Sequence, residues 1–183
     1  LHKPQGCVST LHDPEGRKTI KDYFHATSLR LYPVGRLDFN TEGLIVLTND
    51  GDFAAQLLHP RSHVPRTYTA KISGILTDQI LAQLRKGVQL DDEMTAPCRI
   101  NKLKKLSTNS WLEITLFEGK KRQIRRMMAS VGCSVIRLKR IGFGSLRLGT
   151  LLPAQSRPLE NEELAQLRTA LTRSSKRTQS ATH

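Results

Sequence analysis

Residues 35–47 read Gly35-Arg36-Leu37-Asp38-Phe39-Asn40-Thr41-Glu42-Gly43-Leu44-Ile45-Val46-Leu47, a polar loop between two glycines that is followed at once by an apolar run. The run from Leu44 to Thr48 predicts a strand that is buried on both faces. A carboxylate in a loop at the mouth of such a strand can be exposed in a cleft and still be held rigidly. Asp38 is therefore a candidate catalytic residue, although an aspartate in a glycine-flanked loop is usually just an Asx-turn residue.

A second segment combines a helical apolar pattern with many cations. Apolar residues recur there at the spacing i, i+3, i+4, i+7: Ile124, Met127, Met128 and Val131. Gly132 ends the predicted helix. On a helical wheel Arg125 lies at the edge of the apolar stripe, where it could pair with a carboxylate in a cleft. Arg122 and Arg126 lie on the far side, where they can contact phosphates. The alternative is an amphipathic helix with a solvated basic face.

The positive charge of the chain is concentrated in one stretch. The 183 residues carry a formal net charge of +13, and the sequence pI is about 10.2. Residues 99–147 hold 13 basic and 2 acidic side chains, whereas residues 1–98 hold 11 of each. Such a field attracts a polyanion, and nucleic acid is the first candidate. The alternative, a charged surface that only aids solubility, would mix its signs more evenly.

Cysteine, histidine and hydropathy patterns exclude several classes of protein. Cys7, Cys98 and Cys133 are scattered and form no CxxC pair, so neither a disulfide framework nor a zinc module is indicated. His59 and His63 have helical spacing, but prolines within and after the pair argue against a metal-binding helix. No apolar run is long enough to span a bilayer. We therefore expect a cytoplasmic protein that has no metal and no membrane partner.

The remaining patterns predict an α+β fold. Strands are predicted at 1–9 (with a break at 4–6), 67–73, 111–117 and 134–141, and helices at 19–24, 53–58, 77–87, 121–131 and 164–171. The absence of a regular β-α alternation argues against a doubly wound sheet. We expect one domain over residues 1–172, built from two closely packed halves, and a disordered basic tail over residues 173–183.

The stretch from Gly35 to Gly51 resembles the catalytic motif of the RsuA/RluB/RluE/RluF-type bacterial rRNA pseudouridine synthases. Three further stretches match motifs of this family in the same order: Lys3-Pro4-Gln5-Gly6, Arg66-Thr67-Tyr68, and Glu118 to Met127 followed by Arg137-Leu138-Lys139-Arg140. The resemblance extends over about residues 1 to 165. It departs from the family at Arg66, where lysine is more common, and at Lys120, where arginine is. Many members carry an S4 domain before the first motif, whereas this sequence begins inside that motif.

The resemblance implies a fold and three catalytic residues. The fold is a mixed, mostly antiparallel bent sheet, flanked by helices and with a central catalytic cleft. Asp38 matches the essential aspartate, Tyr68 the tyrosine that stacks on the target uracil, and Arg125 the arginine that pairs with the aspartate. The family uses no cofactor, in keeping with a reaction that neither oxidises nor hydrolyses its substrate. The carboxylate could attack C1′ or C6, or remove a ribose proton.

We therefore expect an isomerase that converts a specific uridine of ribosomal RNA to pseudouridine, in the large-subunit rather than the small-subunit RNA. Its partner would be ribosomal RNA, with the uridine flipped into the cleft of a monomeric enzyme. Eight cations are candidate RNA-binding residues: Arg36, Lys120, Lys121, Arg122, Arg126, Arg137, Lys139 and Arg140.

Two alternatives remain at this point. The first is a catalytically silent RNA-binding or ribosome-assembly protein on the same fold. The second is a metal-dependent nuclease that uses Asp50, Asp52 or the acidic run Asp91-Asp92-Glu93, but these acids lie in expected turns.

Overall fold

The computed structural model describes residues 1–24, 29–74, 76–91, 93–105 and 108–179, without the side chains of Lys105 and of residues 172–179. The chain forms two compact units. Unit 1 consists of Leu1–Val64 and Arg140–His183, and unit 2 consists of Pro65–Lys139. Strand β10 (Ser134–Phe143) begins in unit 2 and ends in unit 1.

Unit 1 contains short strands and two α-helices. β1 (His2–Lys3) pairs antiparallel with β3 (Glu42–Leu44), β3 neighbours the end of β10, and β10 pairs antiparallel with β11 (Leu146–Arg147). β2 (Tyr32–Pro33) and β4 (Leu47–Thr48) form a separate antiparallel pair. The helices are α1 (Gly51–Leu58), α4 (Asn161–Gln179) and two 3-10 turns, Ile20–Tyr23 and Pro60–Ser62.

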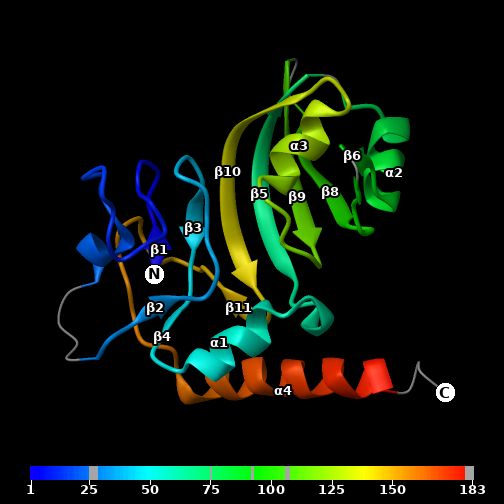
Figure 1. Ribbon diagram of the computed structural model, residues 1–183. Helices are drawn as coiled ribbons and strands as arrows, with labels where there is room; N and C mark the ends of the chain where they lie inside the picture. The colour runs from blue at the N-terminus through cyan, green and yellow to red at the C-terminus, as the bar shows by residue number, and fades with distance from the viewer. Residues whose placement is uncertain (25–28, 75, 92, 106–107, 180–183) are drawn as a thin grey trace. The chain divides into compact units, whose positions relative to one another are not determined.

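The core of unit 1 joins residues that are far apart in sequence. Phe53 and Leu57 of α1 pack in one cluster with Leu167 and Leu171 of α4, and Figure 1 shows these helices side by side. Asp50 caps α1, because its side chain accepts a hydrogen bond from the Phe53 backbone N–H at 2.9 Å. α4 continues to Gln179, so residues 173–179 are helical where a disordered tail is expected. That segment lacks an apolar pattern but also lacks the proline or glycine that would end a helix.

Unit 2 is an antiparallel sheet with two helices. β9 (Asn109–Leu116) lies between β5 (Arg66–Ser73) and β8 (Arg99–Lys105), and the first part of β10 borders β5. α2 (Asp78–Lys86) and α3 (Gln123–Ala129) lie on the same side of these strands (Figure 1). β6 (Gln89–Leu90) and β7 (Glu93–Met94) form a small hairpin of their own.

The predicted α+β class with mostly antiparallel strands is confirmed. The single strand expected over Leu44–Thr48 is wrong, because β3 ends at Leu44 and β4 begins at Leu47. Ile45 and Val46 are buried in the step between two different strand pairs, with Ile45 N–H donating to Leu1 O and Val46 O accepting from Val34 N–H. An apolar run indicates that a segment is buried, but it does not show that the segment is one strand. Here the chain passes from one sheet to another while it remains buried.

Candidate active site

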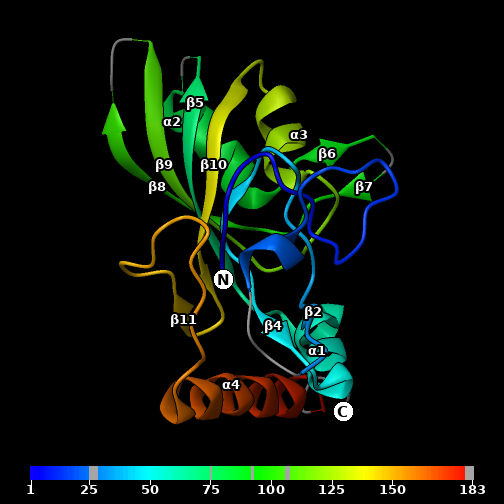
Figure 2. The ribbon, with the colours of Figure 1, turned by 90° about the vertical axis from the view of Figure 1, so that its left-hand side faces the viewer.

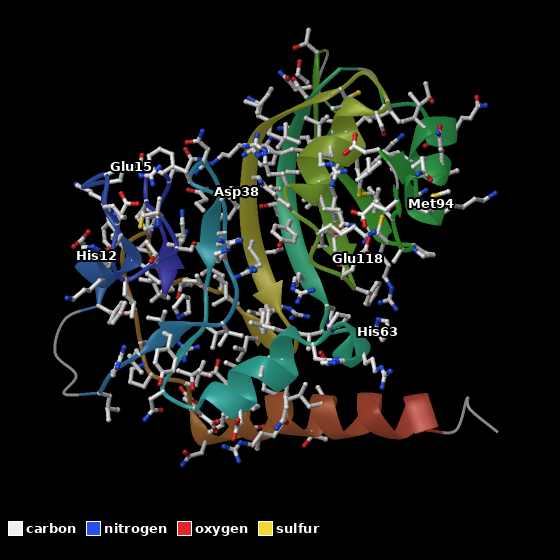
Figure 3. All side chains as sticks on the ribbon, viewed as in Figure 1. His12, Glu15, Asp38, His63, Met94 and Glu118 are labelled. Atoms are coloured by element: carbon white, nitrogen blue, oxygen red, sulfur yellow. The ribbon has the colours of Figure 1, made fainter. Side chains whose placement is uncertain are left out.

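The loop that carries Asp38 lies in unit 1 between β2 and β3 (Figure 3). Thr41 N–H donates to Asp38 O at 3.0 Å, which closes a turn just after the carboxylate. The N-terminal segment holds the backbone on both sides. Ser9 Oγ donates to Leu37 O and accepts from Leu37 N–H, and Gly6 N–H donates to Phe39 O. The position of Asp38 is therefore fixed by hydrogen bonds to its neighbours.

Lys3 is a buried cation beside this loop. Its side chain is 0% exposed, and Nζ donates to Thr41 O at 2.9 Å, Pro4 O at 3.0 Å and Phe39 O at 3.5 Å. Burial lowers the pKa of Lys3 to about 8, although Cys7, Asp38 and Glu42 oppose this effect. The sequence analysis finds Lys3 only as part of a motif. The structure shows why a lysine is needed, since its three donors meet three loop carbonyls.

Gly43 and Arg140 make a close backbone contact inside unit 1. Gly43 has φ +117°, and a Cβ there would lie 2.2 Å from the carbonyl oxygen of Arg140. The Arg140 side chain is 2% exposed, its Nε donates to Leu44 O at 2.7 Å, and its guanidinium lies over the Phe143 ring. Arg140, a candidate RNA contact in the sequence, is therefore buried in this conformation and supports the backbone at Leu44.

Tyr68 lies on β5 of unit 2, opposite Ile114 of β9. It shares the buried face of its strand with Ala70 and Ile72, as the alternation predicts, and it is 9% exposed. Arg66, two residues earlier, lies close to Gly119, where a Cβ would be 3.3 Å from the guanidinium carbon. Tyr68 is thus firmly packed, and packing is compatible with one face stacking on a base.

Arg125 lies on α3 of unit 2, half-buried at the edge of an apolar face. Ile124, Met127 and Met128 are buried, and Arg125 Nη1 donates to Val135 O at 3.2 Å. The expected helix over 121–131 is shorter than predicted, because Arg122 adopts φ +50° and the helix begins at Gln123. Asp38 therefore belongs to unit 1, whereas Tyr68 and Arg125 belong to unit 2.

The N-terminal end of α3 is held by a polar cluster. The Gln123 side chain accepts from Lys120 N–H and donates to Glu118 Oε1, which also accepts from Ala96 N–H at 2.9 Å. Glu118 is labelled in Figure 3. A hydrogen bond from Lys120 to Glu93 raises the pKa of Lys120. This cluster fixes the backbone from which the basic side chains of the segment project.

The candidate RNA-binding cations differ in their surroundings. Arg36, Lys121, Arg122 and Arg137 are exposed and Lys139 is half-buried. Lys120 and Arg126 instead form ion pairs with acids of the β6–β7 hairpin. These pairs could not be predicted from local patterns, because the acids lie about thirty residues before the cations.

Two further findings concern metal binding and membrane-spanning helices. Among the described residues, no three histidine, cysteine or acidic side chains lie close enough to hold a metal ion. Asp92, named above for a nuclease, lies outside the described residues. No helix in the described part of the chain is long and apolar enough to cross a membrane.

Comparison with known proteins places these motifs in a family. The family model described as RNA pseudouridylate synthase matches residues 1–130. The chain is 41% identical over 170 residues to the ribosomal large subunit pseudouridine synthase B of Bacillus subtilis (strain 168), covering 92% of this chain and 70% of that protein. It is 38% identical over 174 residues to the ribosomal large subunit pseudouridine synthase E of Vibrio parahaemolyticus, covering 87% of this chain and 72% of that protein.

A solved structure agrees with the sequence comparisons. The crystal structure of a pseudouridylate synthase superimposes with a TM-score of 0.81 at 31% identity, covering 91% of this chain and 71% of the other. This chain belongs to the RNA pseudouridylate synthase family. The resemblance found in the motifs, the mostly antiparallel α+β fold and the expected enzyme class, an RNA pseudouridine synthase, are thereby confirmed.

Proposed function

We propose that this protein converts a uridine of large-subunit ribosomal RNA to pseudouridine, with Asp38 as the essential carboxylate. The observation that carries the proposal is the loop around Asp38, whose backbone is hydrogen-bonded to Lys3 and Gly6 of the first motif and to Ser9 just after it. The relatives named as ribosomal large subunit pseudouridine synthases supply the class of RNA.

The reaction is an isomerisation, so no atom is gained or lost overall. The N1–C1′ bond breaks, the uracil rotates, C5 bonds to C1′, the C5 proton leaves and N1 becomes protonated. We propose that the Asp38 carboxylate starts this sequence, as a nucleophile at C1′ or C6 or as the base that removes a ribose proton. Tyr68 is proposed to stack on the uracil, an interaction of roughly 1–3 kcal/mol, and its hydroxyl is a candidate acceptor for the C5 proton.

For Arg125 we propose the role that the motif match implies, an ion pair with the carboxylate of Asp38 during the reaction. This role rests on the motif match.

The RNA is proposed to reach the enzyme through exposed cations. Arg36, Lys121, Arg122 and Arg137 are exposed and Lys139 is half-buried, so all five can approach phosphates. Flipping a uridine out of folded RNA costs a few kcal/mol, which phosphate contacts and stacking offset. We further propose that the enzyme acts as a monomer in the cytoplasm, where ribosomal RNA is assembled.

The test is Asp38→Asn, assayed on a large-subunit rRNA transcript by mapping pseudouridine after carbodiimide treatment. We expect activity to fall by ~10³-fold or more, while RNA affinity and the thermal unfolding midpoint stay close to those of the wild type. Asp52→Asn, an exposed aspartate of α1, is the matched control and is expected to remain fully active. Pseudouridine formation by Asp38→Asn at the wild-type rate would refute the assignment.

A further inference from the structure

Two carboxylates of the β6–β7 hairpin form ion pairs with two cations at α3. Figure 2 shows the hairpin beside this helix. The guanidinium of Arg126 forms an ion pair with Asp91, and its Nη1 lies 3.8 Å from Glu93 Oε1. Lys120 Nζ lies 2.8 Å from Glu93 Oε2. One hairpin therefore neutralises two of the cations that the sequence analysis assigns to RNA.

The acids are more exposed than the cations that they pair with. The side chains of Lys120 and Arg126 are 20% and 30% exposed, whereas those of Glu93 and Asp91 are 47% and 79% exposed. Lys120 Nζ also donates to Met94 O at 3.0 Å and lies 3.8 Å from Glu118. A phosphate that binds either cation therefore competes with a carboxylate already paired with it.

The hairpin is anchored at its base. Leu90 is buried, and Thr95 Oγ1 accepts a hydrogen bond from Val88 N–H at 2.9 Å. Gly87 allows a close approach there, because a Cβ would lie 2.3 Å from Thr95 O. The base of the hairpin is therefore fixed by packing and hydrogen bonds.

Neighbouring cations of the same segment are accessible. Lys121 and Arg122 are exposed and form no ion pair with any residue that the structure describes. Lys121 and Arg122 can thus contact any polyanion directly. Lys120 and Arg126 must first break an ion pair with a carboxylate.

We propose that Asp91 and Glu93 are specificity-determining residues that compete with RNA phosphates for Lys120 and Arg126. The inference rests on the proposed function in that its partner is RNA. An RNA whose phosphates fit both cations replaces the two ion pairs by two others, whereas an RNA that does not fit meets two uncompensated carboxylates. The hairpin weakens binding to unrelated RNA more than binding to the substrate.

The variants Asp91→Asn and Glu93→Gln remove the charges with little change in shape. Asp91 has φ +51°, a conformation that asparagine adopts readily, so the turn is preserved. Asp52→Asn is the control for net charge, because it removes one exposed carboxylate of unit 1 without releasing either cation.

The test measures the affinity of the intact chain for a labelled, uridine-rich single-stranded RNA by fluorescence anisotropy as a function of KCl concentration. Two cations that newly contact phosphates add ~1.4 to the slope of log affinity against log salt for a single strand. The double variant should therefore bind this RNA roughly three- to tenfold more tightly at low salt, and lose about sevenfold more affinity than the wild type between about 50 and 200 mM. On large-subunit rRNA, KM should change and kcat should not.

Weaker binding by the double variant, or a salt slope equal to that of the wild type, would overturn the proposal, because the acids would then merely position the cations. An equal effect of Asp52→Asn would also overturn it. Because RNA binding is measured without turnover, the proposed function and the proposed role of the hairpin can be refuted independently of each other. A wild type that forms no pseudouridine contradicts the proposed function alone, and an unchanged slope in an active enzyme contradicts the hairpin proposal alone.

Discussion

Replacing Lys3 by methionine tests the idea that a buried ammonium organises the loop of Asp38. The pKa of Lys3 is about 8 in the folded protein against an ordinary 10.5, because burial disfavours its charged form. Between these two pH values the unfolded chain binds more protons than the folded chain, so wild-type stability rises with pH across that window. Lys3→Met lacks this contribution, whatever its other effects.

The magnitude follows from the two pKa values. At roughly 1.4 kcal/mol for each pKa unit, the full difference corresponds to ~3 kcal/mol, and the hydrogen bonds from the ammonium to three carbonyls reduce our expectation to ~1–2 kcal/mol. At pH 7 two effects oppose each other. The variant no longer buries a charge, but it leaves the carbonyls of Pro4, Phe39 and Thr41 without their donor, at a cost of ~1–3 kcal/mol.

The assay is urea unfolding of both proteins, followed by circular dichroism at several pH values from 7 to 10.5. Between pH 8 and 10.5 we expect the free energy of unfolding of the wild type, relative to that of Lys3→Met, to increase by ~1–2 kcal/mol. Lys21→Met, which removes an exposed lysine of the same unit, serves as the control and should run parallel to the wild type. Parallel curves for the wild type and Lys3→Met would refute the reasoning.

Two further predictions concern packing and the basic helix. Gly43→Ala places a methyl group 2.2 Å from Arg140 O at a positive φ, so we expect it to lower the free energy of unfolding by ~3 kcal/mol or more, measured by thermal denaturation. Gly51→Ala, which meets nothing within 4 Å, should have little effect. In the pseudouridine assay Arg125→Ala should lower kcat strongly, whereas Arg126→Ala should mainly weaken RNA binding and flatten its salt dependence. Equal losses of catalysis and binding in both variants would contradict these roles.

Local patterns predicted the elements that depend on local physics. The strand predicted at 67–73 is present as β5, where Tyr68, Ala70 and Ile72 are buried because alternate side chains of a strand point to the same face. Thr77 and Gly87 marked the ends of α2, since capping residues act on their own helix.

The features that the sequence analysis missed depend on distant partners. Strand β8 carries few apolar residues and owes its place to pairing with β9. The burial of Arg140 follows from its approach to Gly43, and the ion pairs of the β6–β7 hairpin join acids to cations of α3. The motif resemblance found the candidate residues, but it could not show that Lys3 is buried or that Lys120 is already paired.

The division of the chain has a consequence for biosynthesis. Unit 2 is one continuous segment, whereas unit 1 needs residues from both ends of the chain. The bond from Arg140 Nε to Leu44 O spans 96 positions in the sequence. A ribosome that makes this protein therefore releases the Asp38 motif long before the strand against which Gly43 packs. The loop of Asp38 therefore acquires its final support only after all of unit 2 and Arg140 have been synthesised.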